Sequence, residues 1–282
     1  MVHQAQYCAD LVRTHDFPRY ASTLFLPAVH RRPMLSIYAF NVEISRVRDQ
    51  VSQPLTGQLR LQWWTDLLAG LDHGGIEGNP VASELLWTIR NWRLPVDRLA
   101  RLIVEHEFDL FNDPMPSLPA LEGYINDTAS TLFVCCARIL VHPAEAIDHV
   151  ARHAGLAYGM IDVVNKLPLD AARRQLFLPQ QFLREHGSSM EEVFAGKQTP
   201  QARAAIDQLT TEANRHLKTT LSLLAETPQQ VRPAFLALAL VCRDVKRLQC
   251  RDYDPFVLRP MPRLRMLWAL WRASRSPLFR GE

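Results

Sequence analysis

Apolar residues recur at every third or fourth position along most of the chain, and the clearest example lies near the N-terminus. The apolar side chains between residues 33 and 51 fall on one helical face: Ile37, Phe40, Ile44, Val47 and Val51. Charged and polar residues flank this face: Glu43, Arg46, Arg48, Asp49 and Gln50. The pattern predicts a core helix at 33–51, and we expect its inward carboxylates to face any cavity that the core encloses.

The same spacing predicts helices elsewhere and no sheet, because no run of alternating apolar and polar β-branched residues occurs. The 19 prolines lie mostly between periodic segments, where they end helices, and Pro168 is expected to end one of the longest. We expect an all-α fold with helices at 4–14, 19–26, 33–51, 58–71, 81–92, 96–111, 121–140, 144–166, 180–186, 200–225, 230–248 and 263–273. Small residues in the helix at 121–140, among them Ser130, allow a neighbouring helix or a ligand to come close.

Composition limits the class of protein. With 282 residues, 48% of them hydrophobic, the chain can bury a large core, and we expect one domain over 1–282. The net charge of +3 does not indicate nucleic-acid binding. Five cysteines without a secretory signal favour reduced thiols in the cytoplasm. No stretch approaches the ~18 uncharged apolar residues of a membrane span.

The motifs of common active sites are missing from the chain, including glycine-rich phosphate loops, H-E-x-x-H and G-x-S-x-G. Glu105 and Asp109 are four residues apart, a spacing at which two carboxylates can share a helix face and hold a hard cation. We expect a solvated face there instead, because exposed acidic pairs are far more common than cation sites.

A more informative pattern joins two distant helices. Ser45 and Asp49 are four residues apart on one helix, and Asp162, Lys166 and Asp170 follow the same spacing on another. A helical enzyme that handles pyrophosphate needs two D-x-x-x-D pairs on facing helices, because their carboxylates hold the Mg²⁺ ions that grip the diphosphate. Here the positions at 45 and 49, and those at 166 and 170, each keep one acid.

Several segments resemble the squalene/phytoene synthase family in order and spacing. These are LFLPAVHRRPMLSIYAFNVEISRVRDQVSQP, RLQWWTDLLAG, GLAYGMIDVVNKLPLDAARRQLFLPQQFL and RDYDPFVLRP. The resemblance covers roughly residues 7 to 265 and is specific at the family level. It implies the all-α isoprenoid synthase fold, with helices around a central, lipid-shaped cavity. Active members join two prenyl diphosphates head to head with Mg²⁺.

The resemblance also implies roles for individual residues. Asp49 and Asp170 match acids of the two motifs, so they would be the catalytic acids and the Mg²⁺ ligands. Residues that match substrate-contacting positions are His15, Tyr38, Asp162, Asn165, Phe177 and Arg259. Ser45 and Lys166 depart from the motifs, and Asp16 replaces a small hydroxyl residue, where it would repel a diphosphate unless a metal or Arg19 intervened. Mg²⁺ is therefore expected only if the protein is catalytic, and no other cofactor is expected.

The variant Y-A-F-N-V-E-I-x-R-V-R-D-x-V-S, followed by R-L-Q-W-W, is similar to a divergent branch of the family, that of the mitochondrial complex I assembly factor. Members of that branch are regarded as non-catalytic. In this interpretation Glu43, Arg46, Arg48 and Asp49 form an internal ion-pair network in place of a metal site, which is either purely structural or part of a ligand site.

The C-terminal segment is basic. Residues 257–280 contain six arginines and no acid, interleaved with leucine and tryptophan. This composition suits a membrane interface with anionic headgroups, and it equally suits a helix packed on the domain with its arginines outward. We treat 263–282 as a basic tail of the single domain and expect a cytoplasmic protein that associates peripherally with membranes.

The sequence leaves three hypotheses. The first is a family member whose pocket binds a prenyl diphosphate or lipid, with condensation weak or lost. The second is an active head-to-head prenyltransferase, in which Asp162 replaces a lost ligand. The third is a non-catalytic assembly-type factor for respiratory complex I that acts through a protein partner.

Overall fold

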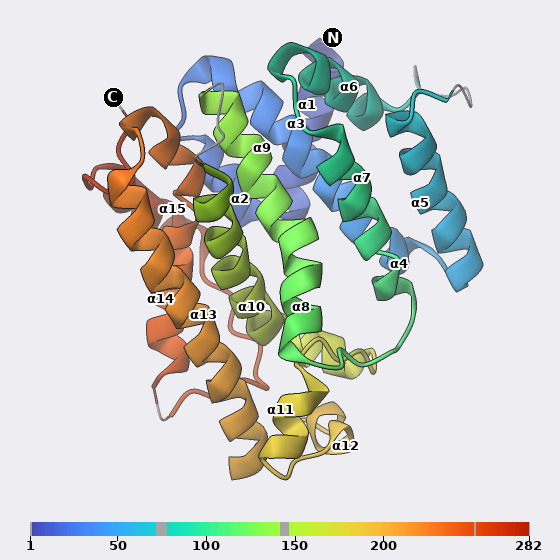
Figure 1. The fold of residues 1–282 in the computed structure, drawn as a ribbon, viewed down its shortest axis with the longest axis vertical. Coiled ribbons are helices and arrows are strands. Elements are labelled where there is room, and N and C mark those ends of the chain that lie inside the picture. Colours follow the sequence, from blue (N-terminus) through green and yellow to red (C-terminus); the bar gives the residue numbers. More distant parts are fainter. Residues whose placement is uncertain (1, 72–77, 142–146, 251, 282) are drawn as a thin grey trace.

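The computed structural model describes residues 2–71, 78–141, 147–250 and 252–281, and every regular element in these ranges is helical (Figure 1). The all-α prediction is therefore confirmed. The first half contains α1 (Val2–His15), α2 (Phe17–Thr23), α3 (Ala28–Ser45), α4 (Val47–Gln50), α5 (Pro54–Leu68), α6 (Pro80–Trp92), α7 (Val96–Glu105) and the 3-10 turn η1 (Phe108–Leu110).

The second half begins with a nearly continuous rod: α8 (Leu118–Ile125), the π-helical turn η2 (Asn126–Ser130) and α9 (Thr131–Leu140). The remaining elements are α10 (Asp148–Ala172), α11 (Gln180–Glu185), α12 (Met190–Phe194), α13 (Pro200–Glu226), the 3-10 segment η4 (Gln229–Phe235), α14 (Leu238–Leu248) and α15 (Arg263–Ser274). In Figure 1 the rod runs down the middle of the molecule, with α13 and α14 to its left and α5 to α7 to its right. The predicted helix start at 144 lies outside the described residues.

The predicted core helix at 33–51 is present but has different ends. It begins at Ala28, directly after Pro27, and it breaks at Arg46, whose backbone (φ −100°, ψ 2°) separates α3 from α4. The predicted apolar face is confirmed, because Ile37, Phe40, Ile44 and Val47 are buried and Val51 is partly buried. After the break, Asp49 of α4 lies next to Arg173 at the end of α10.

Pro168 does not end its helix, contrary to the prediction. α10 continues through it to Ala172. An interior proline costs a helix about 3 kcal/mol. The buried face of α10 nevertheless continues past the proline, from Val164 through Leu167 to Ala171, and packing of this face offsets the cost. The extra turn carries Asp170 and leads into Arg173.

The predicted helix at 96–111 is also shorter than expected. α7 ends at Glu105, and the chain then turns through η1. Glu105 and Asp109 are therefore not on one helix face, and the expectation of a shared, solvated face was wrong. Asp109 instead points into the molecule.

Small residues bring α10 against η2 and the end of α8. A Cβ atom placed on Gly155 would lie 2.4 Å from the backbone Cα of Ser130, and one on Gly159 would lie 2.6 Å from the side chain of Ile125. The Ser130 hydroxyl donates to the carbonyl of Arg152 at 3.1 Å. The expectation that Ser130 allows a close approach is confirmed, and this contact fixes the distance between two walls of the central cavity.

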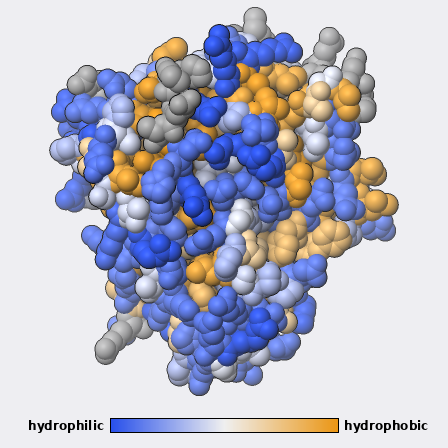
Figure 2. Space-filling view, viewed as in Figure 1, coloured by the Kyte–Doolittle hydropathy of each residue, from blue (hydrophilic) through white to orange (hydrophobic). Residues whose placement is uncertain are grey.

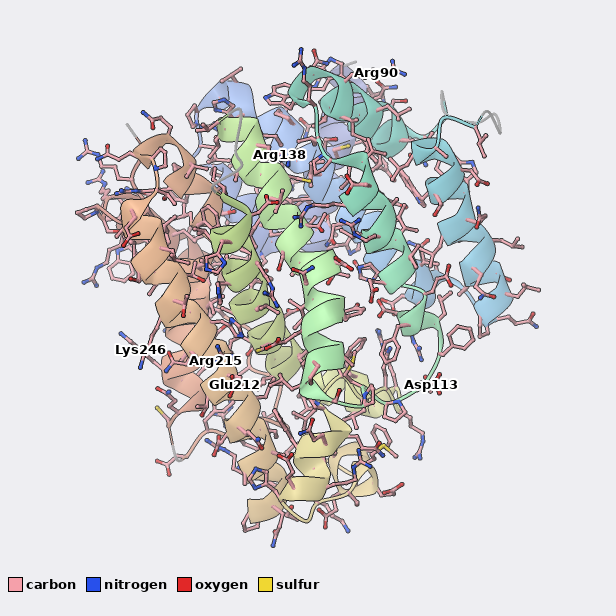
Figure 3. All side chains as sticks on the ribbon, viewed as in Figure 1. Arg90, Asp113, Arg138, Glu212, Arg215 and Lys246 are labelled. Atoms are coloured by element: carbon pink, nitrogen blue, oxygen red, sulfur yellow. The ribbon has the colours of Figure 1, made fainter. Side chains whose placement is uncertain are left out.

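The outer surface is mostly polar. Glu212 and Arg215 on α13, for example, pair at 2.8 Å (Figure 3). Apolar side chains gather at the right edge of Figure 2, over α5, where Leu55 and Leu59 are exposed. Within the described residues no helix is both long enough and apolar enough to cross a membrane.

Candidate functional site

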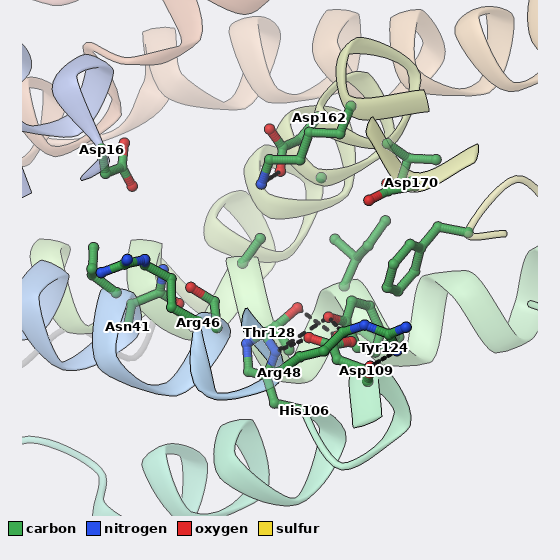
Figure 4. A pocket seen from close by; sticks show the side chains of 18 of the residues that line it. Asp16, Asn41, Arg46, Arg48, His106, Asp109, Tyr124, Thr128, Asp162 and Asp170 are labelled. Carbon is green, nitrogen blue, oxygen red and sulfur yellow. Dashed lines mark hydrogen bonds and ion pairs between the residues drawn. The ribbon is translucent and has the colours of Figure 1, made fainter. Parts of the chain in front are cut away.

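A cavity of about 470 Å³ lies between α10 and a wall built from α2, α3, α4, η1, α8 and η2 (Figure 4). α10 supplies a single face to it, because Tyr158, Asp162, Lys166 and Asp170 follow one another at intervals of four residues. The central cavity expected for the fold is thus present. The other ionisable side chains in its lining are His15, Asp16, Arg19, Arg46, Arg48, Asp49, His106, Asp109 and Arg173.

Three carboxylates of the cavity each form an ion pair with a cation of the same chain. Arg173 contacts Asp49 at 2.7 Å, so α4 is tied to the end of α10. Lys166 contacts Asp162 at 2.7 Å within α10. On α2, Arg19 contacts Asp16 at 2.5 Å. The cation that the sequence required beside Asp16 is therefore Arg19.

Asp170 differs from these three acids because no described residue forms an ion pair or a side-chain hydrogen bond with it. Its carboxylate points into the cavity (Figure 4). Burial raises its pKa to about 7, and the charge of Asp162 adds to this effect, while Lys166 and Arg173 oppose it. Asp170 therefore gains or loses its charge near neutral pH.

Among the cations of the cavity, Arg46 resembles Asp170 in forming no ion pair with a described residue. It lies at the break between α3 and α4, and it lines the cavity without a hydrogen bond or ion pair to any other described side chain. His15 lines the same region, and its pKa is lowered by burial and by the charge of Arg46. Arg46 gives this end of the cavity positive character, and its charge also acts on Glu43, whose pKa is raised by burial and lowered by Arg46.

A hydrogen-bonded cluster forms another part of the wall. The ring Nδ1 of His106 lies 2.6 Å from Asp109, and the Tyr124 hydroxyl donates to the same carboxylate at 2.9 Å. Arg48 donates to the backbone carbonyl of Asp109 and, at 2.5 Å, to Asn112. The Nε2 atom of His106 is buried and has no partner among the described residues.

The internal ion-pair network expected for Glu43, Arg46, Arg48 and Asp49 does not form among these four residues. Asp49 pairs with Arg173 on α10, and Arg48 binds the loop after η1. The side chains that do pair come from distant parts of the chain. Spacing along one helix could not reveal such partners.

A second cavity, of about 320 Å³, adjoins the first. Both cavities are lined by Pro18, Tyr158 and Asp162, which form a shared partition. Asn165 and Arg259 line this second cavity. Asn165 is held in place, because it donates to Asp244 at 3.0 Å and accepts from Arg247 at 2.7 Å.

The residues that the sequence singled out are thus divided among three places. His15, Asp49, Asp162, Asp170 and Phe177 line the first cavity, and Asp162 also faces the second with Asn165 and Arg259. Tyr38 is outside both linings. It is buried, it accepts a hydrogen bond from Cys136 at 3.2 Å, and its ring lies 5.7 Å from the guanidinium of Arg19.

Sequence reasoning did not place Arg173, His106, Asp109 or Tyr124 in the cavity. The one signal available for the cluster was the His-x-x-Asp spacing of His106 and Asp109 just after a helix end. No three acidic, histidine or cysteine side chains within the described ranges lie close enough together to hold a metal ion.

Comparison with known proteins gives the following matches. The family model for squalene/phytoene synthase matches residues 12–272. The NADH dehydrogenase (ubiquinone) complex I assembly factor 6 of Rattus norvegicus is 31% identical over 250 residues, which cover 89% of this chain and 75% of that protein. The chloroplastic phytoene synthase of Narcissus pseudonarcissus is 22% identical over 265 residues, covering 90% and 60%.

Among solved structures, a crystal structure of a dehydrosqualene synthase in complex with ligand superposes with a TM-score of 0.81 at 15% identity, covering 96% of this chain and 95% of that one. The helices therefore have the isoprenoid synthase arrangement that the sequence predicted.

Proposed function

This chain belongs to the squalene/phytoene synthase family, and we propose that its central cavity binds a prenyl diphosphate, or a lipid of that shape, with condensation weak or lost. One observation carries the proposal: the motif positions that would hold Mg²⁺ lie against cations of the chain itself. Arg173 pairs with Asp49, and Lys166 occupies the position of a second acid and pairs with Asp162.

These residues do not fit a magnesium site. Mg²⁺ takes about six oxygen ligands, and the sites that hold two ions use several carboxylates. Lys166 brings a positive charge to the place of a ligand, which repels a cation. Asp49, the surviving acid of the first motif, already has its charge neutralised by Arg173.

The remaining charges fit an anionic ligand. Arg46 lines the cavity without a hydrogen bond or ion pair to another described side chain, and a guanidinium can bind a phosphate through two parallel hydrogen bonds. The apolar wall from Ile125 through Leu132 to Phe177 suits a hydrocarbon chain. An isoprenoid tail with a phosphate head therefore matches both parts of the lining. The second cavity, beyond the shared partition, offers further room.

The proposal predicts binding without turnover. Farnesyl diphosphate or geranylgeranyl diphosphate is added to the purified protein with Mg²⁺, and both the melting temperature and the release of diphosphate are measured. We expect the melting temperature to rise, because a ligand at 100 times its Kd adds about 2.7 kcal/mol to the free energy of unfolding. Arg46→Gln should weaken this binding roughly tenfold, whereas the matched Arg90→Gln on the outer end of α6 should not.

Two outcomes would contradict the proposal. Diphosphate release that Asp49→Ala abolishes would establish an active head-to-head prenyltransferase. A melting temperature unaffected by either prenyl diphosphate would show that the cavity does not bind this class of ligand. The double variant Ser45→Asp/Lys166→Asp restores both motifs, and turnover that appears only in this variant would support the assignment of the lost chemistry to these two positions.

A second candidate function rests on the similarity to complex I assembly factor 6, at 31% identity over 89% of this chain. In this case the protein assists the assembly of a respiratory complex through a protein partner, with or without a ligand in the cavity. Affinity purification from cells, followed by mass spectrometry, tests this candidate. Enrichment of complex I subunits would support it, and their absence together with normal complex I activity in a deletion strain would refute it.

A further inference from the structure

α15 is apolar on both of its faces. Leu270 is buried on the inner face, where α15 packs against α2 and α14. The outer face carries Leu264, Trp268 and Trp271, which are 82%, 55% and 43% exposed. At 100° per residue these three side chains lie within about 60° of arc. An exposed apolar stripe on a helix that already buries its inner face is typical of a surface that contacts a partner.

Arginines border this stripe. The guanidinium of Arg275 lies 4.1 Å from the ring centroid of Trp271, and that of Arg272 lies 5.8 Å from that of Trp268. Residues 257–280 hold six arginines and no acid, whereas the whole chain has a net charge of +3. All other residues together therefore carry a net charge of −3. Two of these arginines, Arg272 and Arg275, lie beside the exposed tryptophans.

The segment before α15 carries two more exposed apolar residues and reaches the second cavity. Val257 and Leu258 are 45% and 49% exposed, and Leu258, Arg259 and Met266 also line the cavity. One stretch of chain thus supplies both the exposed apolar stripe and one wall of the cavity.

Charge and side-chain type together favour an anionic lipid bilayer as the partner. Tryptophan and arginine are the residues that amphipathic helices place at the boundary between headgroups and acyl chains, and each arginine near an anionic surface adds attraction. A second copy of the chain fits poorly, because a symmetric contact through the stripe would bring Arg272 and Arg275 near the same arginines of the other copy. A nucleic acid would contact the arginines but would leave the apolar side chain of Leu264 exposed to solvent.

We propose that the outer face of α15, with Val257 and Leu258, docks the protein on an anionic lipid surface and places the second cavity at the membrane. The docking does not depend on the proposed function. If the second cavity also serves as an entrance for a membrane lipid, that role rests on the proposed function.

Flotation with vesicles tests the docking in the absence of any prenyl ligand. The full-length protein is mixed with vesicles of phosphatidylcholine, or of phosphatidylcholine with phosphatidylglycerol. We expect preferential binding to the anionic vesicles that weakens as salt increases. Leu264→Glu/Trp268→Glu should reduce binding roughly tenfold or more, because the two apolar side chains that would enter the bilayer are replaced by carboxylates, which the anionic headgroups repel. The matched control is Leu55→Glu/Leu59→Glu on α5, where both leucines are 65% exposed.

Equal binding of both double variants would overturn the proposal. So would equal binding to neutral and anionic vesicles, or a dimer in solution that only Leu264→Glu/Trp268→Glu dissociates, because the stripe would then be covered by a second copy. Failure of flotation would leave ligand-induced changes in melting temperature intact, so the two proposals fail separately.

An environment-sensitive fluorophore tests the orientation. Leu258→Cys, in a Cys250→Ser background that removes an exposed thiol, is labelled with nitrobenzoxadiazole and mixed with anionic vesicles. We expect its emission to shift to the blue as the label enters the bilayer. The same label on Leu59→Cys should stay in water, and an equal shift at both positions, or no shift at Leu258, would refute the proposed orientation.

Discussion

Asp170 shows how one side chain can set the charge of the whole cavity. It faces the cavity without a partner among the described side chains, and burial raises its pKa to about 7. The neighbouring acids Asp49 and Asp162 have cations beside them. Asp170 is thus the cavity acid whose charge is least compensated, and an anionic ligand will meet it charged above neutral pH and uncharged below.

This pKa predicts a pH-dependent effect of Asp170→Asn on stability. The folded-state pKa lies above the unfolded value, so between about pH 4 and pH 7 the folded protein holds a proton that the unfolded chain has released. The free energy of unfolding therefore decreases as pH rises through this range. Asp170→Asn should stabilise the protein by about 1 kcal/mol or more at pH 8 and have little effect at pH 4.

Urea denaturation at both pH values measures the difference. The matched control is Asp113→Asn, an acid exposed on the loop before α8, which should change stability equally little at both. Equal effects of Asp170→Asn at pH 4 and pH 8 would show that the carboxyl group titrates normally.

At the scale of elements, the contact between α10 and η2 determines the width of the cavity. Gly155→Ala is predicted to destabilise the protein by about 1–3 kcal/mol, because the new methyl group overlaps the backbone of Ser130. Gly123→Ala on α8 is the control: a methyl group there meets nothing within 4 Å. It should stabilise the helix by about 0.5–1 kcal/mol. Chemical denaturation of both variants decides, and a neutral Gly155→Ala would mean that the helices separate without cost.

The elements also show what the sequence could reveal about the site. Helical periodicity and the family resemblance identified α3, α10 and the acids Asp49 and Asp170. Local rules failed where packing overrides them, as at Pro168, whose helix continues for another turn. Arg173 follows that turn, so its pairing with Asp49 could not be foreseen. The position of Asp109 was predicted wrongly for a related reason. α7 ends at Glu105, and no residue before Glu105 indicates that the helix ends there.

At the scale of the whole molecule, the apolar core extends from Cys8 to Phe279, so residues near both ends of the chain belong to the same packing unit. The first cavity draws its lining from residues between His15 and Phe177, and the second also uses α14 and the segment before α15. The isoprenoid synthase arrangement follows from the order of the helices, which the sequence supplied. The charge balance inside it depends on contacts between elements, which only the structure supplies.

The pairing of cavity acids with arginine and lysine has a consequence for the stability of the fold in the absence of divalent ions. A fold whose facing carboxylates needed a bridging cation would loosen when that cation was withdrawn. Here the compensation is covalently part of the chain, so we expect a chelator such as EDTA to leave the melting temperature within about 1 °C of its value in Mg²⁺. A substantial drop in EDTA, reversed by added magnesium, would contradict this. We therefore expect the protein to fold even where free divalent ions are scarce.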